Sequence, residues 1–321
     1  MQVSVILCTY NRQDYLRKVL DSIAVSVLPP SVEWEVLVVD NNSNDQTPEV
    51  VKEFAHRYPG RFRYALEPHQ GKSYALNTGI REARGEIVAF VDDDVTVEPT
   101  WLWNLTKALE NNEWAGAGGR TLLSGSLSVP PWLVTSGPYH MEFVLAPLFD
   151  LGDEPRTLNR PPFGANMAYR KAMFNKYGAF RTDLGPSPDP EVPRPNEDTE
   201  FGRRLLAAGE RLRYEPCAIV HHPVSENRIQ KDYFLHWWFD LGRAQIREAG
   251  RRPDIWGIQR RYWSIAKITA AVLTVRAWRW FLSANPAKRF YFKCFVWMTA
   301  GQVVEIYRRW GPIKTPACAT S

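Results

Sequence analysis

The first 120 residues alternate short apolar runs with amphipathic stretches, and this alternation constrains the fold more than any other feature of the sequence. Apolar, β-rich runs fall at 3–7, 34–39, 61–66 and 87–91, and stretches with helical spacing fall at 12–27, 48–58, 73–83 and 100–111. Strands that alternate with helices favour a parallel sheet covered on both faces. We therefore predict an α/β fold with a Rossmann-like, mostly parallel sheet flanked by helices.

Polar side chains stand where three of these strands end. Thr9 follows the first strand, Asp40 ends the second, and Asp92-Asp93-Asp94 follows the fourth. Ligands of open α/β sheets bind outside the carboxyl ends of the strands. We expect these side chains to converge at one edge of the sheet, and this expected convergence is the main physical argument for a site.

The acidic triplet is the strongest candidate for a metal site. Adjacent carboxylates repel one another unless a cation neutralises them, and their oxygens suit Mg²⁺ or Mn²⁺ bridged to a diphosphate. Asp92 and Asp94 alternate, so one can face a ribose and the other the metal. A solvated acidic turn is the competing interpretation.

Two further segments have both a functional and a structural interpretation. Asp40 can accept the imide N–H of a uracil, or it can belong to an Asx-rich turn with the residues that follow. Gly71-Lys72-Ser73 precedes a helix, so its backbone N–H groups and Lys72 can face phosphate. The segment lacks the glycine spacing of a P-loop, and the first strand is not followed by Gly-x-Gly-x-x-Gly, which argues against an NAD or FAD site.

The chain also offers a candidate base and further polar groups. Asn196-Glu197-Asp198 opens a helix, where such residues cap any helix, but Asp198 can also deprotonate an acceptor hydroxyl. His222 follows an apolar run and can complete a metal shell or steady a leaving diphosphate, although a lone histidine is more often structural. Arg228 can pair with phosphate oxygens.

The C-terminal region differs in composition from the rest of the chain. From residue 241 onward there are 15 Lys and Arg, 3 Asp and Glu, and six tryptophans, a net charge of +12 against −7 for the remainder. We predict a catalytic domain over 1–228 and a basic, aromatic-rich helical region over 229–321. Its apolar stretches at 263–282 and 290–307 carry charges, which favours helices lying on an anionic membrane surface over helices crossing it.

Other partners and the compartment follow from weaker signals. A helical lobe that packs on the body of the protein, or a homodimer contact, is the alternative use of the C-terminal region. The four scattered cysteines and the N-terminus without a signal-like segment favour a cytoplasmic protein. We expect it to associate peripherally with the inner face of the membrane and to have no nucleic-acid partner.

Taken together, the motifs resemble those of the family 2 glycosyltransferases, which have the GT-A fold. The matching segments, over roughly residues 1–245, are Cys8-Thr9-Tyr10-Asn11-Arg12, Val38-Val39-Asp40-Asn41-Asn42-Ser43, Gly71-Lys72-Ser73 through Asn77-Thr78-Gly79-Ile80, Asp92-Asp93-Asp94, Gly164-Ala165-Asn166-Met167, Glu197-Asp198-Thr199-Glu200, and His222-Pro223-Val224 with Arg228. Each segment alone is weak evidence for this family, but their combination in this order is specific to it. Leu76 departs from the pattern, because family members often have an arginine just before the asparagine of the third segment.

The resemblance implies an inverting transferase that uses a nucleoside-diphosphate sugar with Mn²⁺ or Mg²⁺. It implies Asp198 as the base, with Asp94 ligating the metal and His222 near the metal or diphosphate. The residues implied at the nucleotide sugar are Thr9, Tyr10, Asn11, Arg12, Asp40, Lys72, Asn77, Asp92, Asp93, Gly164, Ala165, Asn166, Glu197 and Arg228. The donor is expected to be UDP-linked, and the acceptor is a hydroxyl of a carbohydrate, lipid-linked or other molecule, as in cell-surface polysaccharide or glycolipid synthesis.

Two other functions compete with this interpretation. A sugar nucleotidyltransferase would share the architecture and the metal carboxylates, but its first strand should lead into a Gly-rich, basic loop. Here that loop is Thr9-Tyr10-Asn11-Arg12, without glycine. A non-catalytic protein that binds nucleotide sugar is the second alternative, and the complete set of acidic residues and His222 argues against it.

Overall fold

The computed structural model describes residues 1–125, 128–249, 269 and 277–310, and the chain divides into two compact units. The first unit comprises Met1–Ser128, Glu142–Val192 and Asn196–Glu226. The second comprises Val129–Met141, Pro193–Pro195 and Asn227–Ser321. The predicted domain boundary after residue 228 stays a prediction, and most of the apolar stretch at 263–282 lies outside the described residues.

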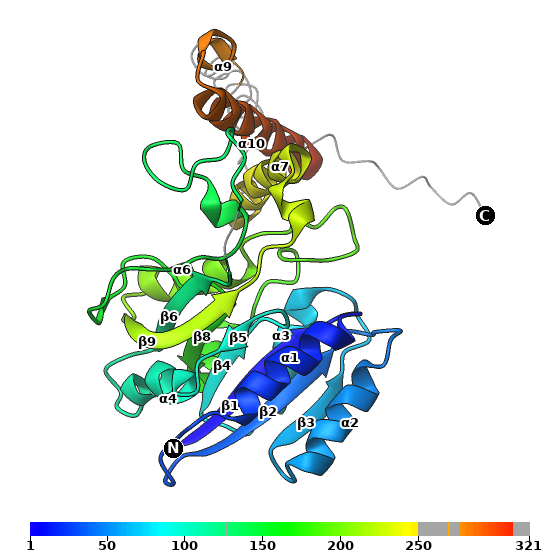
Figure 1. Cartoon of the computed structure of the whole chain (residues 1–321), viewed down its shortest axis with the longest axis vertical. Helices are drawn as coiled ribbons and strands as arrows, with labels where there is room; N and C mark the ends of the chain where they lie inside the picture. Colours follow the sequence, from blue (N-terminus) through cyan, green and yellow to red (C-terminus); the bar gives the residue numbers. More distant parts are fainter. Residues whose placement is uncertain (126–127, 250–268, 270–276, 311–321) are drawn as a thin grey trace, which may run out of the picture. The chain divides into compact units, whose positions relative to one another are not determined.

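A single mixed sheet organises the first unit (Figure 1). Its strands are β1 (Gln2–Thr9), β2 (Glu33–Asp40), β3 (Phe62–Leu66), β4 (Ile87–Val91), β5 (Thr96–Val97), β6 (Gly116–Leu123), β7 (Arg156–Thr157), β8 (Asn166–Arg170) and β9 (Leu212–His222). The order is β3-β2-β1-β4-β8-β6-β9-β5, with β7 beside β9. The first four strands pair in parallel, as predicted, while β8 joins β4 and β6 in antiparallel pairs.

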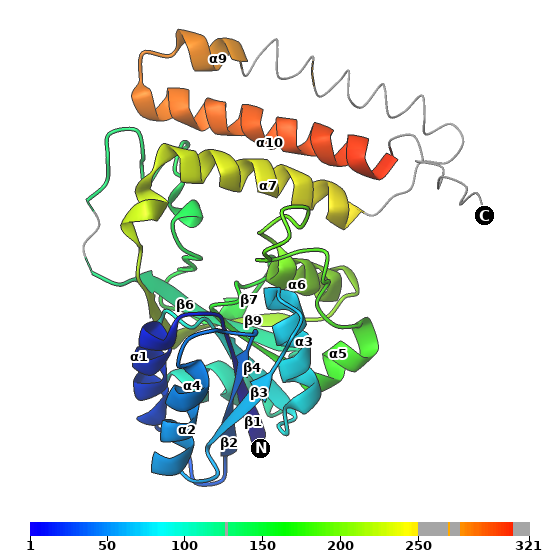
Figure 2. The same ribbon diagram turned by 90° about the vertical axis from the view of Figure 1, so that its right-hand side faces the viewer.

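Helices cover both faces of this sheet, so the predicted α/β architecture is confirmed (Figures 1 and 2). They are α1 (Gln13–Ala24), α2 (Thr47–Arg57), α3 (Lys72–Glu82), α4 (Trp101–Thr106), α5 (Lys171–Tyr177) and α6 (Glu197–Ala207), with short 3₁₀ helices at Lys107–Leu109 and Glu142–Val144. Strand residues alternate between two cores because successive side chains point to opposite faces. Val36 and Val38 join the core beneath α1, α2 and α4, whereas Leu37 and Val39 join the core beneath α3, α5 and α6.

The described part of the second unit that follows residue 226 is mostly helical. It contains α7 (Lys231–Ala249), α9 (Ala277–Leu282) and α10 (Pro286–Trp310), preceded by a 3₁₀ turn at Glu226–Ile229. Figure 2 shows α7 and α10 lying side by side, and these two helices make extensive contact. Trp132 packs edge-on against Phe234 of α7 and Phe290 of α10, which ties the segment before residue 141 to both helices. Among the described helices, none is long and apolar enough to span a bilayer.

Candidate active site

The ends of β1, β2 and β4 bring the predicted polar residues together. Thr9 pairs with Asp40 in the register of β1 and β2, and Leu7 pairs with Val91, so the acidic triplet lies beside the end of β1. The Thr9 hydroxyl donates a hydrogen bond of 2.8 Å to Asp93 Oδ2. Three segments that are far apart in the sequence therefore form one edge, as the parallel register requires.

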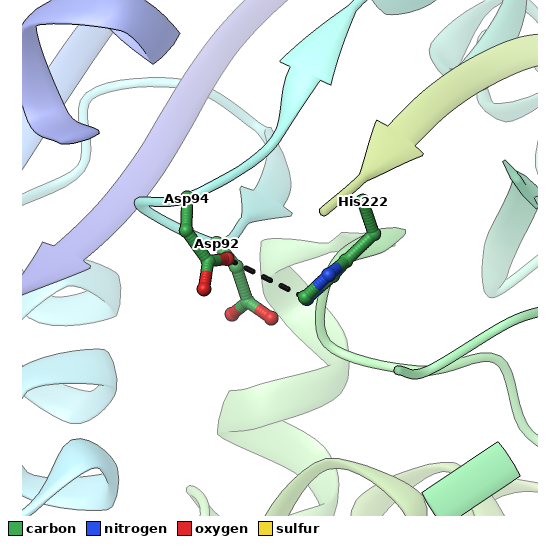
Figure 3. A group of neighbouring side chains, drawn as sticks. All are labelled: Asp92, Asp94 and His222. Carbon is green, nitrogen blue, oxygen red and sulfur yellow. Dashed lines mark ion pairs between the residues drawn. The ribbon is translucent and has the colours of Figure 1, made fainter. Parts of the chain in front are cut away.

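Asp92, Asp94 and His222 form a group that can hold a metal ion (Figure 3). One candidate ligand atom from each residue lies within 4.8 Å of the others. His222 is 2% exposed, and its Nδ1 donates a hydrogen bond of 2.6 Å to the Pro223 carbonyl. A carbonyl can only accept, so Nδ1 carries the hydrogen of this bond, and Nε2 is the ring atom that faces Asp94 Oδ1 at 3.5 Å.

The donor set fits a divalent cation of the predicted kind. Carboxylate oxygens suit both Mg²⁺ and Mn²⁺, and a histidine nitrogen lies beside them. The three ligand atoms come from the turn after β4 and from the end of β9. A sheet edge built from residues about 130 positions apart therefore supplies a partial shell, with positions left for oxygens of a substrate.

Lys72 links this group to the acidic residues of α6. Its Nζ lies 2.7 Å from Asp92 Oδ1 and 3.5 Å from Glu197 Oε1. Burial alone would lower the pKa of Lys72, but the negative charges of Asp92, Glu197 and Asp198 raise it well above its usual value. The ammonium therefore stays charged and offers a permanent cation next to the candidate metal group.

Asp198 stands in the first turn of α6 and accepts two backbone hydrogen bonds. The N–H of Gly164 donates to Oδ2 at 2.5 Å, and the N–H of Thr199 donates to Oδ1 at 2.6 Å. Even so, burial raises the pKa of Asp198. Burial and the neighbouring Asp198 raise the pKa of Glu197 to about 7. A carboxyl whose pKa is raised binds a proton more tightly than an ordinary carboxyl, which suits a general base.

Gly164 has no room for a side chain at this point. A Cβ on Gly164 would lie 3.1 Å from Asp198 Oδ2, so glycine lets the backbone approach the carboxylate directly. The neighbouring Ala165 is fully buried. The backbone N–H of Gly164 is therefore the group of the predicted Gly164-Ala165-Asn166 segment that contacts Asp198.

Asp40 is held rigidly at the end of β2. Tyr64 donates its hydroxyl hydrogen to Asp40 Oδ2 at 2.9 Å, and the N–H of Ser43 donates to Oδ1 at 2.9 Å. The carboxylate is 1% exposed. Asp40 therefore holds the backbone of Ser43 and stands at the strand end beside Thr9, and its contact with a base stays a prediction.

Asn41 holds the backbone of the segment that leads to Lys72, a role that was not predicted from the sequence. Its Nδ2 donates to the carbonyls of Glu67 and His69 at 3.1 and 2.8 Å, and its Oδ1 accepts from the N–H of Gly71 at 2.7 Å. Gly71 has φ of +139°, a conformation that favours glycine. The signal available in the sequence was the residue's place directly after a strand-end aspartate.

The remaining predicted residues fall into different environments. Tyr10 is 43% exposed, and Asn11 adopts left-handed φ of +52° while its Oδ1 accepts from the Asn44 N–H at 2.7 Å. Asn77 exchanges two hydrogen bonds of 2.9 Å with the backbone of Phe180. Arg228 lies in the 3₁₀ turn Glu226–Ile229, within the second unit.

The Asn166 side chain is engaged within the fold. Its Oδ1 accepts from Trp101 Nε1 at 2.8 Å, and its Nδ2 donates to the carbonyls of Arg120 and Ala218 at 2.9 and 2.8 Å. The residue is 1% exposed. It therefore joins β8, β6 and β9 to α4, which is a structural use of a position predicted to bind the donor.

The family of the chain follows from a direct comparison: it belongs to glycosyl transferase family 2, whose model matches residues 4–178. A glucosyl-dolichyl phosphate glucuronosyltransferase of Haloferax volcanii is 28% identical over 243 residues, which span 74% of this chain and 75% of that protein. The succinoglycan biosynthesis protein ExoM of Rhizobium meliloti is 27% identical over 267 residues, 83% of this chain and 80% of that protein.

Solved structures agree on the fold. The mannosyltransferase PcManGT from Pyrobaculum calidifontis, in complex with GDP-Man and Mn²⁺, superposes with a TM-score of 0.54 at 19% identity, covering 97% of this chain and 76% of that one. GalNAc-T7 with UDP, GalNAc and Mn²⁺ gives 0.53 at 16% identity, covering 73% and 48%. The chain is thus a family 2 glycosyltransferase with the GT-A fold, as the motifs indicated.

Proposed function

We propose that the protein is an inverting, metal-dependent transferase that moves a sugar from a UDP-linked donor to an acceptor hydroxyl. The observation that carries the proposal is the double contact of Lys72, with Asp92 on one side and Glu197 on the other. This contact brings the acidic pair of α6 next to the group Asp92, Asp94 and His222. A base, a permanent cation and a metal-binding group then meet at one sheet edge.

Each group has a task in a single displacement. Asp198 takes the proton of the acceptor hydroxyl, whose oxygen forms a bond to the anomeric carbon while the bond from that carbon to the diphosphate oxygen breaks. One carboxylate acting as base, with no covalent sugar intermediate, inverts the anomeric configuration. Lys72 stabilises the negative charge that develops on the diphosphate.

Asp94 and His222 would hold the metal, with Asp92 between the metal and the ribose. A bound Mn²⁺ or Mg²⁺ supplies Lewis-acid stabilisation of the departing diphosphate. Thr9, Asp40 and Asp92 line the edge at which we place the nucleoside. Tyr10, exposed next to Thr9, offers a ring on which a base can stack.

The acceptor is proposed from the relatives. One is named for succinoglycan biosynthesis and another for glucuronosyl transfer to a glucosyl-dolichyl phosphate. We infer that this chain extends a cell-surface polysaccharide or a glycolipid. Working at the cytoplasmic face of a membrane would bring it to such acceptors, and the net charge of +12 after residue 241 supports attraction to anionic lipid.

Donor binding is the first test of the proposed function. Calorimetric titration with UDP should show binding that depends on Mn²⁺, and Asp94→Ala should remove that dependence. Asp21→Ala, which removes an exposed carboxylate that lies 3.6 Å from Arg57, serves as the control. Incubation with UDP-sugars and acceptor should release UDP, whereas release of pyrophosphate would identify a nucleotidyltransferase instead.

The membrane proposal has its own test. The full-length protein should co-sediment with vesicles containing phosphatidylserine and remain in solution with pure phosphatidylcholine vesicles, since each basic side chain near an anionic surface contributes about 1 kcal/mol. Raising the salt concentration should release it. Equal binding to both vesicles, or to neither, would contradict peripheral binding through charge.

A further inference from the structure

Asp93, the middle carboxylate of the triplet, has both its oxygens engaged within the protein. Thr9 Oγ1 donates to Oδ2 at 2.8 Å, and Arg12 Nη1 donates to Oδ1 at 2.8 Å. The residue is 7% exposed. A buried carboxylate that is hydrogen-bonded to a hydroxyl and to a guanidinium is held in one orientation. Asp93 is therefore placed to anchor other groups.

The group that Asp93 anchors is Arg12, at the start of α1. The same Nη1 that contacts Asp93 lies 2.9 Å from Asp94 Oδ2. The guanidinium also lies over the ring of Tyr15, 5.3 Å from its centroid. Arg12 is thus fixed between a buried carboxylate and an aromatic face, and its nitrogen reaches one chosen oxygen of Asp94.

Because of this contact, the two oxygens of Asp94 face different residues. Oδ2 is occupied by Arg12, while Oδ1 faces His222 Nε2 at 3.5 Å. A carboxylate that rotates freely about its Cβ–Cγ bond would present either oxygen. With Oδ2 engaged, Oδ1 is the oxygen directed towards the candidate metal group.

We propose that Arg12 and Asp93 act as a positioning pair, which orients Asp94 so that Oδ1 is presented to a divalent cation. The resemblance implied that both residues contact the donor; the geometry instead assigns them to the metal site. The inference rests on the proposed metal-dependent function, since it gives the pair its purpose. Mn²⁺ and Mg²⁺ require defined ligand directions, and groups that fix those directions contribute to affinity without touching the ion.

A charge-balanced double variant tests the pair. Arg12→Gln with Asp93→Asn removes one positive and one negative charge, so the net charge beside the metal group stays the same. We expect Mn²⁺ affinity, measured by calorimetry without nucleotide, to fall by about tenfold or more, as is typical when partners of metal ligands are removed. The electron paramagnetic resonance spectrum of bound Mn²⁺ should change as well, because the coordination becomes less uniform.

The matched control is Arg17→Gln with Glu53→Gln. This exposed pair, 2.8 Å apart, joins α1 to α2 away from the acidic triplet. It should leave both the affinity and the spectrum unchanged. Arg12→Lys keeps the charge and a nitrogen near the two carboxylates, so it should retain more affinity than the double variant. Thr9→Val keeps shape and charge but loses the bond to Asp93, and it should weaken Mn²⁺ binding even where the double variant does not fold.

The outcomes separate this inference from the proposed function. Wild-type affinity in Thr9→Val and in a folded double variant would overturn the positioning role while leaving the metal site intact. Wild-type Mn²⁺ binding in Asp94→Ala would overturn the metal site itself, and the inference with it. Loss of affinity in the double variant, partial retention in Arg12→Lys and no change in the control would establish the pair.

Discussion

Both units of the protein bury charge, but they neutralise it differently. In the sheet unit, Lys72 lies 2.7 Å from Asp92 and 3.5 Å from Glu197, and Arg12 lies 2.8 Å from Asp93 and 2.9 Å from Asp94. In the helical unit, Glu305 of α10 is 1% exposed and lies 2.6 Å from Arg247, 3.3 Å from Arg243 and 3.7 Å from Arg309. Two cations shared among four carboxylates leave an anionic site that favours a metal ion, whereas one carboxylate among three arginines has its charge compensated by the protein.

The two units also use glycine for different purposes. Gly164 gives the sheet unit a backbone N–H at the carboxylate of Asp198. Gly242 and Gly301 let α7 and α10 touch, since a Cβ on either would lie within 2.0 Å of a carbonyl oxygen of the facing helix. This close contact brings Glu305 within reach of the arginines on α7. Glycine therefore brings a backbone N–H to a candidate catalytic carboxylate in the sheet unit, and it brings two helices into contact in the helical unit.

The largest expected effect is the loss of turnover in Asp198→Asn. An amide cannot accept the acceptor proton, so the transfer rate should fall by about 10²- to 10⁴-fold, the usual contribution of a general base. Binding of UDP with Mn²⁺ should be retained, because the metal group is intact. Glu200→Gln, two residues further along α6 and paired with Arg204 at 2.6 Å, is the control. Near-normal turnover in Asp198→Asn would remove it from the chemistry.

Much of this site was predictable because strand ends are visible in a sequence. The alternation of apolar runs and helical stretches located β1, β2 and β4, and the parallel sheet then required Thr9, Asp40 and the aspartates to meet. The helix start at Glu197 was visible from its asparagine and acidic residues.

Other features could not be predicted, because they depend on side-chain partners brought together by tertiary structure. The sequence predicts that Arg12 contacts the donor, and it gives no sign of the ion pairs that Arg12 makes with Asp93 and Asp94, about 80 positions away. Asn166 looks identical in the sequence whether it binds a ligand or three groups of the protein. The contacts of Glu305 with α7 depend on a helix crossing between residues about 60 positions apart, and local patterns carry no information on such a crossing.

A second prediction concerns the ion pairs that Glu305 makes with arginines in the helical unit. Glu305→Gln removes the buried carboxylate that Arg243 and Arg247 share, while Asp240 stays 3.1 Å from Arg243. The free energy of unfolding should fall by about 3 kcal/mol, the lower end of the usual cost of breaking a buried ion pair. Chemical denaturation followed by tryptophan fluorescence would measure the loss. Asp232→Asn removes the same charge from an exposed position on α7 and should cost far less. Equal losses in the two variants would contradict a special role for burial.

The raised carboxyl pKa values predict that the rate of sugar transfer falls at acidic pH. Burial raises the pKa of Asp198, and burial with Asp198 raises that of Glu197 to about 7. A base works deprotonated, so the rate should fall by about tenfold per pH unit once the pH drops below the pKa of Asp198. Because burial raises that pKa, the fall should begin at a higher pH than an ordinary aspartate would give. A rate that falls only where an ordinary aspartate is protonated would contradict a raised pKa of the base.

The smallest effect concerns Asp40, whose orientation depends on Tyr64. Tyr64→Phe removes the 2.9 Å hydrogen bond to Oδ2 but leaves the Ser43 N–H on Oδ1, so the carboxylate keeps one of its two anchors. UDP binding should weaken by at most about 1 kcal/mol, roughly fivefold, the net contribution of one partly exposed hydrogen bond. Tyr74→Phe on α3 is the control. If Asp40 reads the base, Tyr64→Phe should weaken UDP more than GDP in parallel titrations; an equal loss for both nucleotides would leave Asp40 as the stabiliser of its turn alone.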